Sequence, residues 1–330
     1  MDFKKLITRY RQFGGIWLVW EYARLGVMPI VVKGFFRCLM KRQSFKAIYP
    51  EVLKRVEPVL IKRYTPFMRS KKEKVRCLKL AHKRSKIIWF CWLQGIEQAP
   101  PIVKACYVSL ERWLVMVIGY RLVVIDDRNW TEYVEMPDYV VRKWEKKQIP
   151  PALFSDLLRL ELLIKYGGTW IDSTVLCTGN VKVNGYGLRI NDYLDADLFL
   201  FQYTKQGSIP VSISNWFITA CSNNEVLMVL RDMLYAYWKD YNCTLDYYIF
   251  HLFFMVLSKE YPEEMAAMPY GYSMNSLVLL HHWEEKFDQG KWNKLTSKVG
   301  FHKLAFRVEE NVKNDKENYY TYILTEYGRI

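Results

Sequence analysis

Residues 150–176, PPALFSDLLRLELLIKYGGTWIDSTVL, decide the fold of this chain. Leucines recur at helical spacing after the two prolines, which predicts a helix that begins at Pro150-Pro151 and ends at Gly167-Gly168. The mostly apolar residues 169–176 then predict a buried strand that follows at once. Asp172 lies inside this strand, where a carboxylate is costly unless a cation meets it. Its partner is expected to be Arg159 or a bound metal ion.

Strands and helices also alternate before and after this stretch. Short apolar runs predict strands over residues 86–92 and 121–125, with a helix over about 102–117 between them. This order predicts an α/β fold with a mainly parallel sheet flanked by helices. Further strands are expected over 196–203 and 211–221, and helices over 224–238 and 245–257. Ligands of such sheets bind beyond the carboxyl ends of the strands, here residues 92–95, 126–129 and the region of Asp172.

The positive charge of the chain is concentrated near its start. The 330 residues carry a net charge of +14, and 51% of them are hydrophobic, which excludes a disordered chain. Residues 1–90 hold 23 Lys and Arg against 5 Asp and Glu. We therefore divide the chain into a basic, mainly helical N-terminal segment, residues 1–85, and a larger domain, residues 86–330. The basic segment suits a polyanionic surface, or it is simply a solvated helical face.

The start of the basic segment is also aromatic. Residues 14–36 are too polar to cross a bilayer, which needs about 20 mostly apolar residues. Trp17, Trp20, Phe35 and Phe36 instead suit head-group depth on an anionic membrane surface. Seven cysteines without a C-x-x-C pair predict a reducing compartment and no disulfide framework. We therefore expect a cytoplasmic protein, peripheral on the inner face of the cell membrane.

The sequence contains no G-x-G-x-x-G after a predicted strand, no G-x-x-x-x-G-K-[ST] motif and no G-x-S-x-G motif. What remains is S-D-L-L-R at 155–159 followed by Y-G-G-T-W-I-D at 166–172. This pattern resembles the signature of bacterial capsular polysaccharide synthesis glycosyltransferases, which are akin to the initiation-specific mannosyltransferases of yeast and, more distantly, to glucosylating clostridial toxins. The likeness covers about residues 86–176 and extends weakly to F-H-K-L-A-F-R at 301–307. It implies a GT-A fold and retaining transfer of a hexose from a nucleoside-diphosphate sugar to a capsular, lipid-linked glycan precursor.

The resemblance also implies a donor site. Trp92 would stack on the nucleobase, Asp156 would bind donor hydroxyls, and Arg159 would meet the sugar or the diphosphate. The full set of expected donor-binding residues is Trp92, Gln94, Asp156, Arg159, Gly168 and Asp172. The alternatives are that Trp92 is a core tryptophan and that the charged residues form only an ion-pair network.

Asp172 matches the first acid of the family's D-x-D element. The resemblance implies that this acid bridges ribose and metal, so Asp172 is a catalytic candidate. Thr174 replaces the second acid, and a hydroxyl binds Mn²⁺ or Mg²⁺ more weakly than a carboxylate does. A metal would then need further ligands such as His281 or His282, although a His pair is more often a packing or surface feature. Alternatively, Lys or Arg side chains alone neutralise the diphosphate.

The acceptor side rests on weaker likenesses. Asn215 and Trp216 resemble family positions near the acceptor. So does Asp246, which is the candidate that orients or deprotonates an acceptor hydroxyl. An acid at a helix N-terminus can also serve the helix dipole alone. Two rival functions stay open. A catalytically silent scaffold of capsule assembly is compatible with Thr174, and a nucleic-acid-binding protein would use the basic segment, although no nucleic-acid partner is expected.

Overall fold

The chain forms two compact units. A computed structural model describes residues 8, 10–179, 190–206 and 209–328. The first unit combines residues 1–79, 135–160 and 225–260, and the second combines residues 80–134, 161–224 and 261–330. The chain therefore passes from one unit to the other several times, once inside helix α8, Pro151–Tyr166. This grouping follows packing, and the division by sequence at residue 85 stays a prediction.

The second unit is built on a five-stranded sheet in the order β2-β1-β3-β6-β5. Its strands are β1 Ile87–Cys91, β2 Arg121–Ile125, β3 Gly168–Asp172, β5 Leu198–Gln206 and β6 Ile209–Ala220. Strand β1 pairs in parallel with both β2 and β3, whereas β6 pairs antiparallel with β3 and β5. Every strand except β6 therefore runs in the same direction. The predicted α/β fold with a mainly parallel sheet is confirmed.

The twin glycines allow the turn from α8 into β3. Gly167 and Gly168 have φ values of 69° and 94°, a region that side-chain-bearing residues rarely adopt. A Cβ atom at Gly168 would lie 2.4 Å from the carbonyl oxygen of Ile87. Gly168 therefore permits β3 to lie directly beside β1, and this packing role needs no donor contact.

The strand predicted over 169–176 is wrong in one respect, because it breaks into two strands. Strand β3 ends at Asp172, a turn follows at Ser173 and Thr174, and β4 Val175–Cys177 belongs to another sheet. There β4 pairs antiparallel with β7, Phe301–Lys303. Two polar residues separate the apolar runs, and the backbone of the second run finds its hydrogen-bond partners in a segment far along the chain.

Helices flank the sheets of the second unit. Helix α5 Pro101–Leu110 continues as a π-helical segment, Glu111–Val117, and packs against β4 and α16 Tyr319–Tyr327. The remaining helices are η2 Ile96–Gln98, α6 Trp130–Tyr133, α9 Ile190–Leu194, α12 Pro262–Ala267, α13 Ser273–His282, α14 Gln289–Thr296 and α15 Glu310–Asn314. One hydrophobic cluster joins the sheet to these helices through residues such as Phe90, Leu176 and Phe301.

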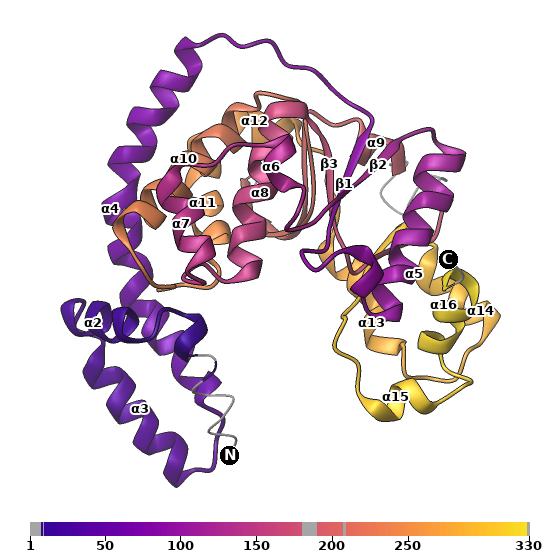
Figure 1. Cartoon of the computed structure of the whole chain (residues 1–330), viewed down its shortest axis with the longest axis horizontal. Coiled ribbons are helices and arrows are strands. Elements are labelled where there is room, and N and C mark those ends of the chain that lie inside the picture. Colours follow the sequence, from indigo (N-terminus) through magenta and orange to yellow (C-terminus); the bar gives the residue numbers. More distant parts are fainter. Residues whose placement is uncertain (1–7, 9, 180–189, 207–208, 329–330) are drawn as a thin grey trace. The chain divides into compact units, whose positions relative to one another are not determined.

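The described part of the first unit is helical. It contains α2 Ile16–Arg24, α3 Met28–Met40, η1 Phe45–Ile48, α4 Tyr49–Cys77, α7 Asp138–Glu145, α10 Glu225–Asp240 and α11 Ile249–Ser258, with the start of α8. Helix α4 buries Val52, Val56, Leu60, Tyr64 and Met68, which recur every fourth residue and so lie on one face. Helix α4 packs against α10 and α11 (Figure 1). The expected mainly helical character of the basic segment is confirmed.

None of the described helices combines the length and the hydropathy that a bilayer crossing needs.

Candidate functional site

The carboxyl ends of three parallel strands meet at one edge of the large sheet. Cys91 at the end of β1 pairs in register with Ile125 of β2 and with Asp172 of β3. Trp92 and Asp126, which follow Cys91 and Ile125, therefore lie at the same edge as Asp172. This is the edge at which ligands bind in sheets of this kind, and the three strand ends named from the sequence do come together.

The carboxylate of Asp172 is held from two sides. The indole N–H of Trp170 donates a hydrogen bond to Oδ1, with an N···O distance of 2.9 Å. The ammonium of Lys303 donates to Oδ2 at 2.7 Å and also to the hydroxyl of Thr174 at 2.8 Å. The Asp172 and Lys303 side chains keep 25% and 21% of their surface exposed, so this ion pair is accessible to a ligand.

Backbone pairing positions Lys303. In the small sheet Lys303 of β7 lies opposite Val175 of β4. The next residue, Leu304, donates its N–H to the carbonyl of Thr174 at 2.8 Å. The ammonium therefore reaches Asp172 and Thr174 from a backbone that is fixed on both sides of residue 303.

The same C-terminal segment packs on Trp92. The ring of Phe306 meets the Trp92 ring edge-on, with centroids 5.6 Å apart. The indole N–H of Trp92 is buried and finds no hydrogen-bond partner among the described residues. An orphaned buried donor is expensive for the folded state, so it is a candidate ligand contact. We call Trp92, Asp172, Thr174, Lys303 and Phe306 the strand-end cluster.

The residues around Asp172 do not match the ligand set of a divalent cation. Mg²⁺ and Mn²⁺ need several oxygen ligands, preferably carboxylates. Here Thr174 replaces the second acid, and both Asp172 and Thr174 accept hydrogen bonds from an ammonium. Throughout the described ranges, no group of three or more His, Cys, Asp or Glu side chains could hold a metal ion.

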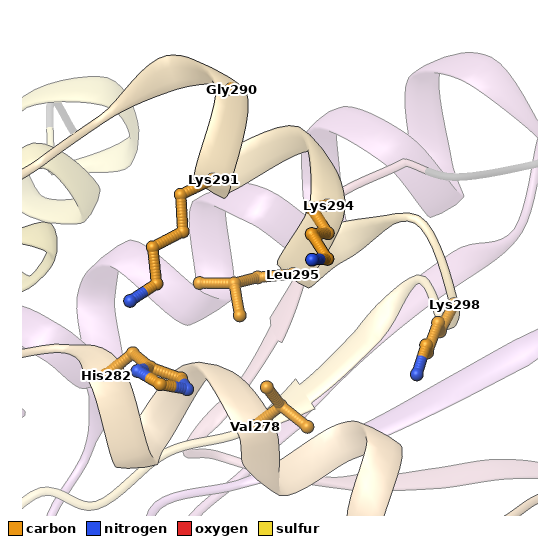
Figure 2. A pocket seen from close by; sticks show the side chains of 7 residues that line it. All are labelled: Val278, His282, Gly290, Lys291, Lys294, Leu295 and Lys298. Carbon is orange, nitrogen blue, oxygen red and sulfur yellow. The ribbon is translucent and has the colours of Figure 1, made fainter.

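The two histidines named as possible metal ligands lie at the end of α13. The His282 ring nitrogen Nδ1 lies 2.7 Å from Glu285 Oε1, whereas His281 is exposed. Figure 2 shows His282 beside a pocket of about 450 Å³ that is lined mainly by lysines and apolar side chains. Three of its lining residues are Lys291, Lys294 and Lys298. Cations in such a pocket disfavour another cation, so a metal role of His282 stays an unsupported prediction.

The acceptor candidates on β6 lie beside the end of β3. Phe217 pairs with Ile171 in the antiparallel register, so Asn215 and Trp216, in the middle of β6, lie where that strand passes the end of β3 at Asp172. The Trp216 ring is 6% exposed and stacks on Phe201, with centroids 4.7 Å apart. This ring belongs to the hydrophobic core of the second unit. Asn215 is half-buried, and the acceptor role of both residues stays a prediction.

Two other donor candidates form a buried ion pair in the first unit. Arg159 lies 3.2 Å from Asp156 Oδ1, and both side chains are more than 90% buried. The guanidinium also donates to the carbonyl and the hydroxyl of Ser155, each at 3.1 Å. The shared helix face that their spacing predicted is confirmed. Their meeting with Asp172, which belongs to the second unit, stays a prediction.

Asp246 lies in the first unit and is buried. Its Oδ1 accepts hydrogen bonds from the Tyr49 hydroxyl at 2.9 Å and from the Tyr248 N–H at 2.8 Å. Its Oδ2 is buried without a partner among the described residues, and burial raises the pKa of the carboxyl group. Tyr49 belongs to the basic segment, so this segment supports a candidate catalytic residue.

Gln94 is exposed in the turn that follows β1, beyond Trp92. The sequence reasoning assigned no role to Lys303 and Phe306, although the stretch 301–307 was part of the resemblance. A lysine and a phenylalanine inside this stretch could have suggested a role in ligand binding. No local sequence pattern, however, connects the stretch to Asp172.

The comparison with protein families agrees with the family resemblance. A family model described as "Capsular polysaccharide synthesis protein" matches residues 37–323, and therefore begins well before residue 86. Among solved structures, "PaToxG Glycosyltransferase" is similar over 73% of this chain and 93% of its own, at 14% identity and a TM-score of 0.35. No curated protein matches the chain.

Proposed function

Because the chain belongs to the capsular polysaccharide synthesis protein family, we propose that it is a glycosyltransferase with a GT-A-like fold. It moves a hexose from a nucleoside-diphosphate sugar to a surface-glycan precursor carried on a lipid. One observation carries the proposal. At the ligand-binding edge of the sheet, an aromatic ring whose indole N–H has no partner among the described residues lies near a lysine–carboxylate pair that is open to solvent.

Each part of the donor has a candidate partner in the strand-end cluster. Trp92 offers an aromatic face to the base, and its indole N–H can donate to the base or the ribose. Asp172 accepts hydrogen bonds from ribose hydroxyls, with Trp170 holding its carboxylate in place. Asp156 and Arg159 remain the proposed partners of the sugar hydroxyls and the diphosphate, since a guanidinium suits phosphate oxygens.

The transfer breaks the bond between the anomeric carbon and the β-phosphate oxygen, which keeps the electron pair. The acceptor hydroxyl oxygen bonds to that carbon and loses its proton, and the configuration is retained. We assign the proton-accepting or orienting role to Asp246. Burial raises the pKa of its carboxyl group, and a higher pKa makes a carboxylate a stronger base.

A thermal-shift panel tests the proposal on the full chain. UDP, GDP, CDP and their sugars are compared, each with EDTA, Mg²⁺ or Mn²⁺. One nucleotide should raise the melting temperature by a few degrees, since a ligand at 100 times its Kd stabilises the folded state by about 2.7 kcal/mol. Asp172→Asn should abolish the shift, whereas Asp192→Asn, an exposed acid on α9, should preserve it. A panel without any shift, or one unaffected by Asp172→Asn, would favour the silent scaffold.

The proposed location is the inner face of the cell membrane, where a lipid-linked acceptor lies. Apolar side chains of α2 and α3 are exposed at Ile16, Trp17, Trp20, Val32, Phe36 and Met40. Exposed basic residues such as Lys33, Lys41 and Arg42 accompany them. Aromatic rings at head-group depth and cations near anionic lipid support peripheral binding, with about 1 kcal/mol per basic residue.

Vesicle co-sedimentation tests this location. Wild type should pellet with vesicles that contain anionic lipid and should be released by high salt. The combined variant Trp17→Ser, Trp20→Ser and Phe36→Ser should lose most of this binding. Met116→Ser, which alters an even more exposed apolar residue of the second unit (73% exposed), should bind like wild type. Point variants are preferable to deletion because Gly14 packs against Cys243. Unchanged pelleting of the combined variant would refute the proposed surface.

A further inference from the structure

We propose that the ammonium of Lys303 takes the place of a divalent cation in binding the donor diphosphate, so that the nucleotide binds without a metal ion. This inference rests on the proposed function and names the group that neutralises the diphosphate. The resemblance implies a metal at the D-x-D element, whereas this chain places its own cation there.

The position of the ammonium carries the inference. The resemblance implies that a metal meets the two acids of the D-x-D element, which are its first and third residues. Here those residues are Asp172 and Thr174, and Lys303 Nζ donates to both of them, at 2.7 and 2.8 Å. Lys303 follows Asp172 by 131 positions and Thr174 by 129 positions in the sequence. This placement is therefore a product of the fold rather than of local sequence.

Electrostatics favour the lysine over a metal at this point. A divalent cation bound by Asp172 and Thr174 would lie within a few ångströms of a positive ammonium, and like charges at that distance repel strongly in a partly buried site. The Thr174 hydroxyl accepts a hydrogen bond well but is a weak metal ligand. The threonine and the lysine are therefore chemically matched at this position, because the hydroxyl accepts the hydrogen bond that the ammonium donates.

The ammonium also keeps capacity for a ligand. A lysine has three N–H donors, and the contacts of Lys303 with Asp172 and Thr174 use two of them. Its side chain remains 21% exposed. The backbone on either side is held by β4, so the cation is positioned before the donor arrives, as preorganised charge stabilisation requires. A phosphate oxygen can accept the third hydrogen bond.

Isothermal titration calorimetry of the full chain with UDP, GDP and CDP tests the inference. Wild type should bind one of them with equal affinity, within about twofold, in EDTA, Mg²⁺ or Mn²⁺. Lys303→Met should weaken this binding by about 10- to 100-fold in EDTA, the loss expected for a charge-assisted hydrogen bond. Lys303→Arg should recover part of it. Lys313→Met, which removes another lysine paired with a carboxylate, Glu310, in the same unit, should bind like wild type.

A double variant restores the metal-type arrangement. Thr174→Asp with Lys303→Ala recreates two acids without the lysine, so its nucleotide binding should be weak in EDTA and rise at least tenfold with Mn²⁺. A double variant that Mn²⁺ does not rescue would contradict the claim that the ammonium occupies the position of a metal.

Other outcomes separate the inference from the proposed function. Wild-type binding that disappears in EDTA and returns with Mn²⁺ would overturn the inference and leave the glycosyltransferase proposal intact. Unchanged affinity of folded Lys303→Met in EDTA would do the same. If no nucleotide binds wild type under any condition, the proposed function is refuted, and the inference falls with it. The wild-type measurements decide even if a variant fails to fold.

Discussion

Acidification should destabilise the second unit through His302, the residue that precedes Lys303 in β7. Its side chain is fully buried, and Nε2 lies 3.2 Å from the Thr178 hydroxyl. Burial lowers the pKa of His302 from 6.5 to about 4, so the folded state keeps the ring neutral. The unfolded chain binds a proton below pH 6.5, whereas the folded chain does so only near pH 4. The stability is complete above pH 6.5 and is lost as the pH falls toward 4.

The size of this effect follows from the two pKa values. Between pH 6.5 and 4 the free energy of unfolding should fall by up to about 1.4 kcal/mol per pH unit for this one group. From pH 7.5 to pH 5 the loss is about 2 kcal/mol. Carboxylates also titrate at low pH and change the stability of every variant in the same way. The contribution of His302 is therefore measured as the difference in pH dependence between wild type and a variant that lacks this histidine.

Urea unfolding followed by tryptophan fluorescence at pH 7.5, 6 and 5 measures that difference. His302→Gln should lose about 2 kcal/mol less than wild type between pH 7.5 and 5, whatever its stability at pH 7.5. His281→Gln alters an exposed histidine of the same unit and should follow the wild-type slope. Parallel slopes for wild type and His302→Gln would refute the reasoning, because they would mean that the folded state accepts the proton as readily as the unfolded chain.

Two further substitutions test the packing around the site by equilibrium unfolding. Gly168→Ala should lower the free energy of unfolding by more than about 3 kcal/mol or prevent folding, because its Cβ would meet the Ile87 carbonyl at 2.4 Å. The control Gly119→Ala, at a similar positive φ but with nothing within 4 Å, should lower it by only about 1–2 kcal/mol. Equal losses would contradict the steric argument. Arg159→Met should lower the free energy of unfolding by about 3–5 kcal/mol, because it leaves the Asp156 carboxylate buried without the guanidinium. Adding Asp156→Leu should recover part of that loss. A loss below about 1 kcal/mol would show that the pair is not buried in solution.

The sheet was predictable because its signals are local. Short apolar strands, helices begun by proline and a Gly-Gly turn lie in order along residues 86–176, and each depends on neighbouring residues. The antiparallel strands β5 and β6 were also expected from their composition. The break after Asp172 was not, because Ser173 and Thr174 are compatible with a strand and only the pairing of β4 with β7 reveals the turn.

The candidate site was predictable only in part. Asp156, Arg159 and Asp172 were recognised because they belong to one continuous motif, and the strand ends were recognised because parallel strands carry them to one edge. Trp216 was predicted to lie near the acceptor, and its stacking on Phe201 places its ring in the core of the second unit. The support of Asp246 by Tyr49 joins residues 197 positions apart, and no sequence pattern records that contact.

The amino-acid sequence alone determined the order of strands and helices, the position of the turn glycines and the choice of Asp172 as the central carboxylate. The first rests on hydrophobic periodicity, the second on backbone dihedral preference, and the third on the cost of a charge among apolar residues. Which cation meets that carboxylate was decided by tertiary structure. Lys303 reaches it only because the chain returns 131 residues later to pair β7 with β4, and such long-range pairing depends on the summed packing of the whole unit rather than on any local segment.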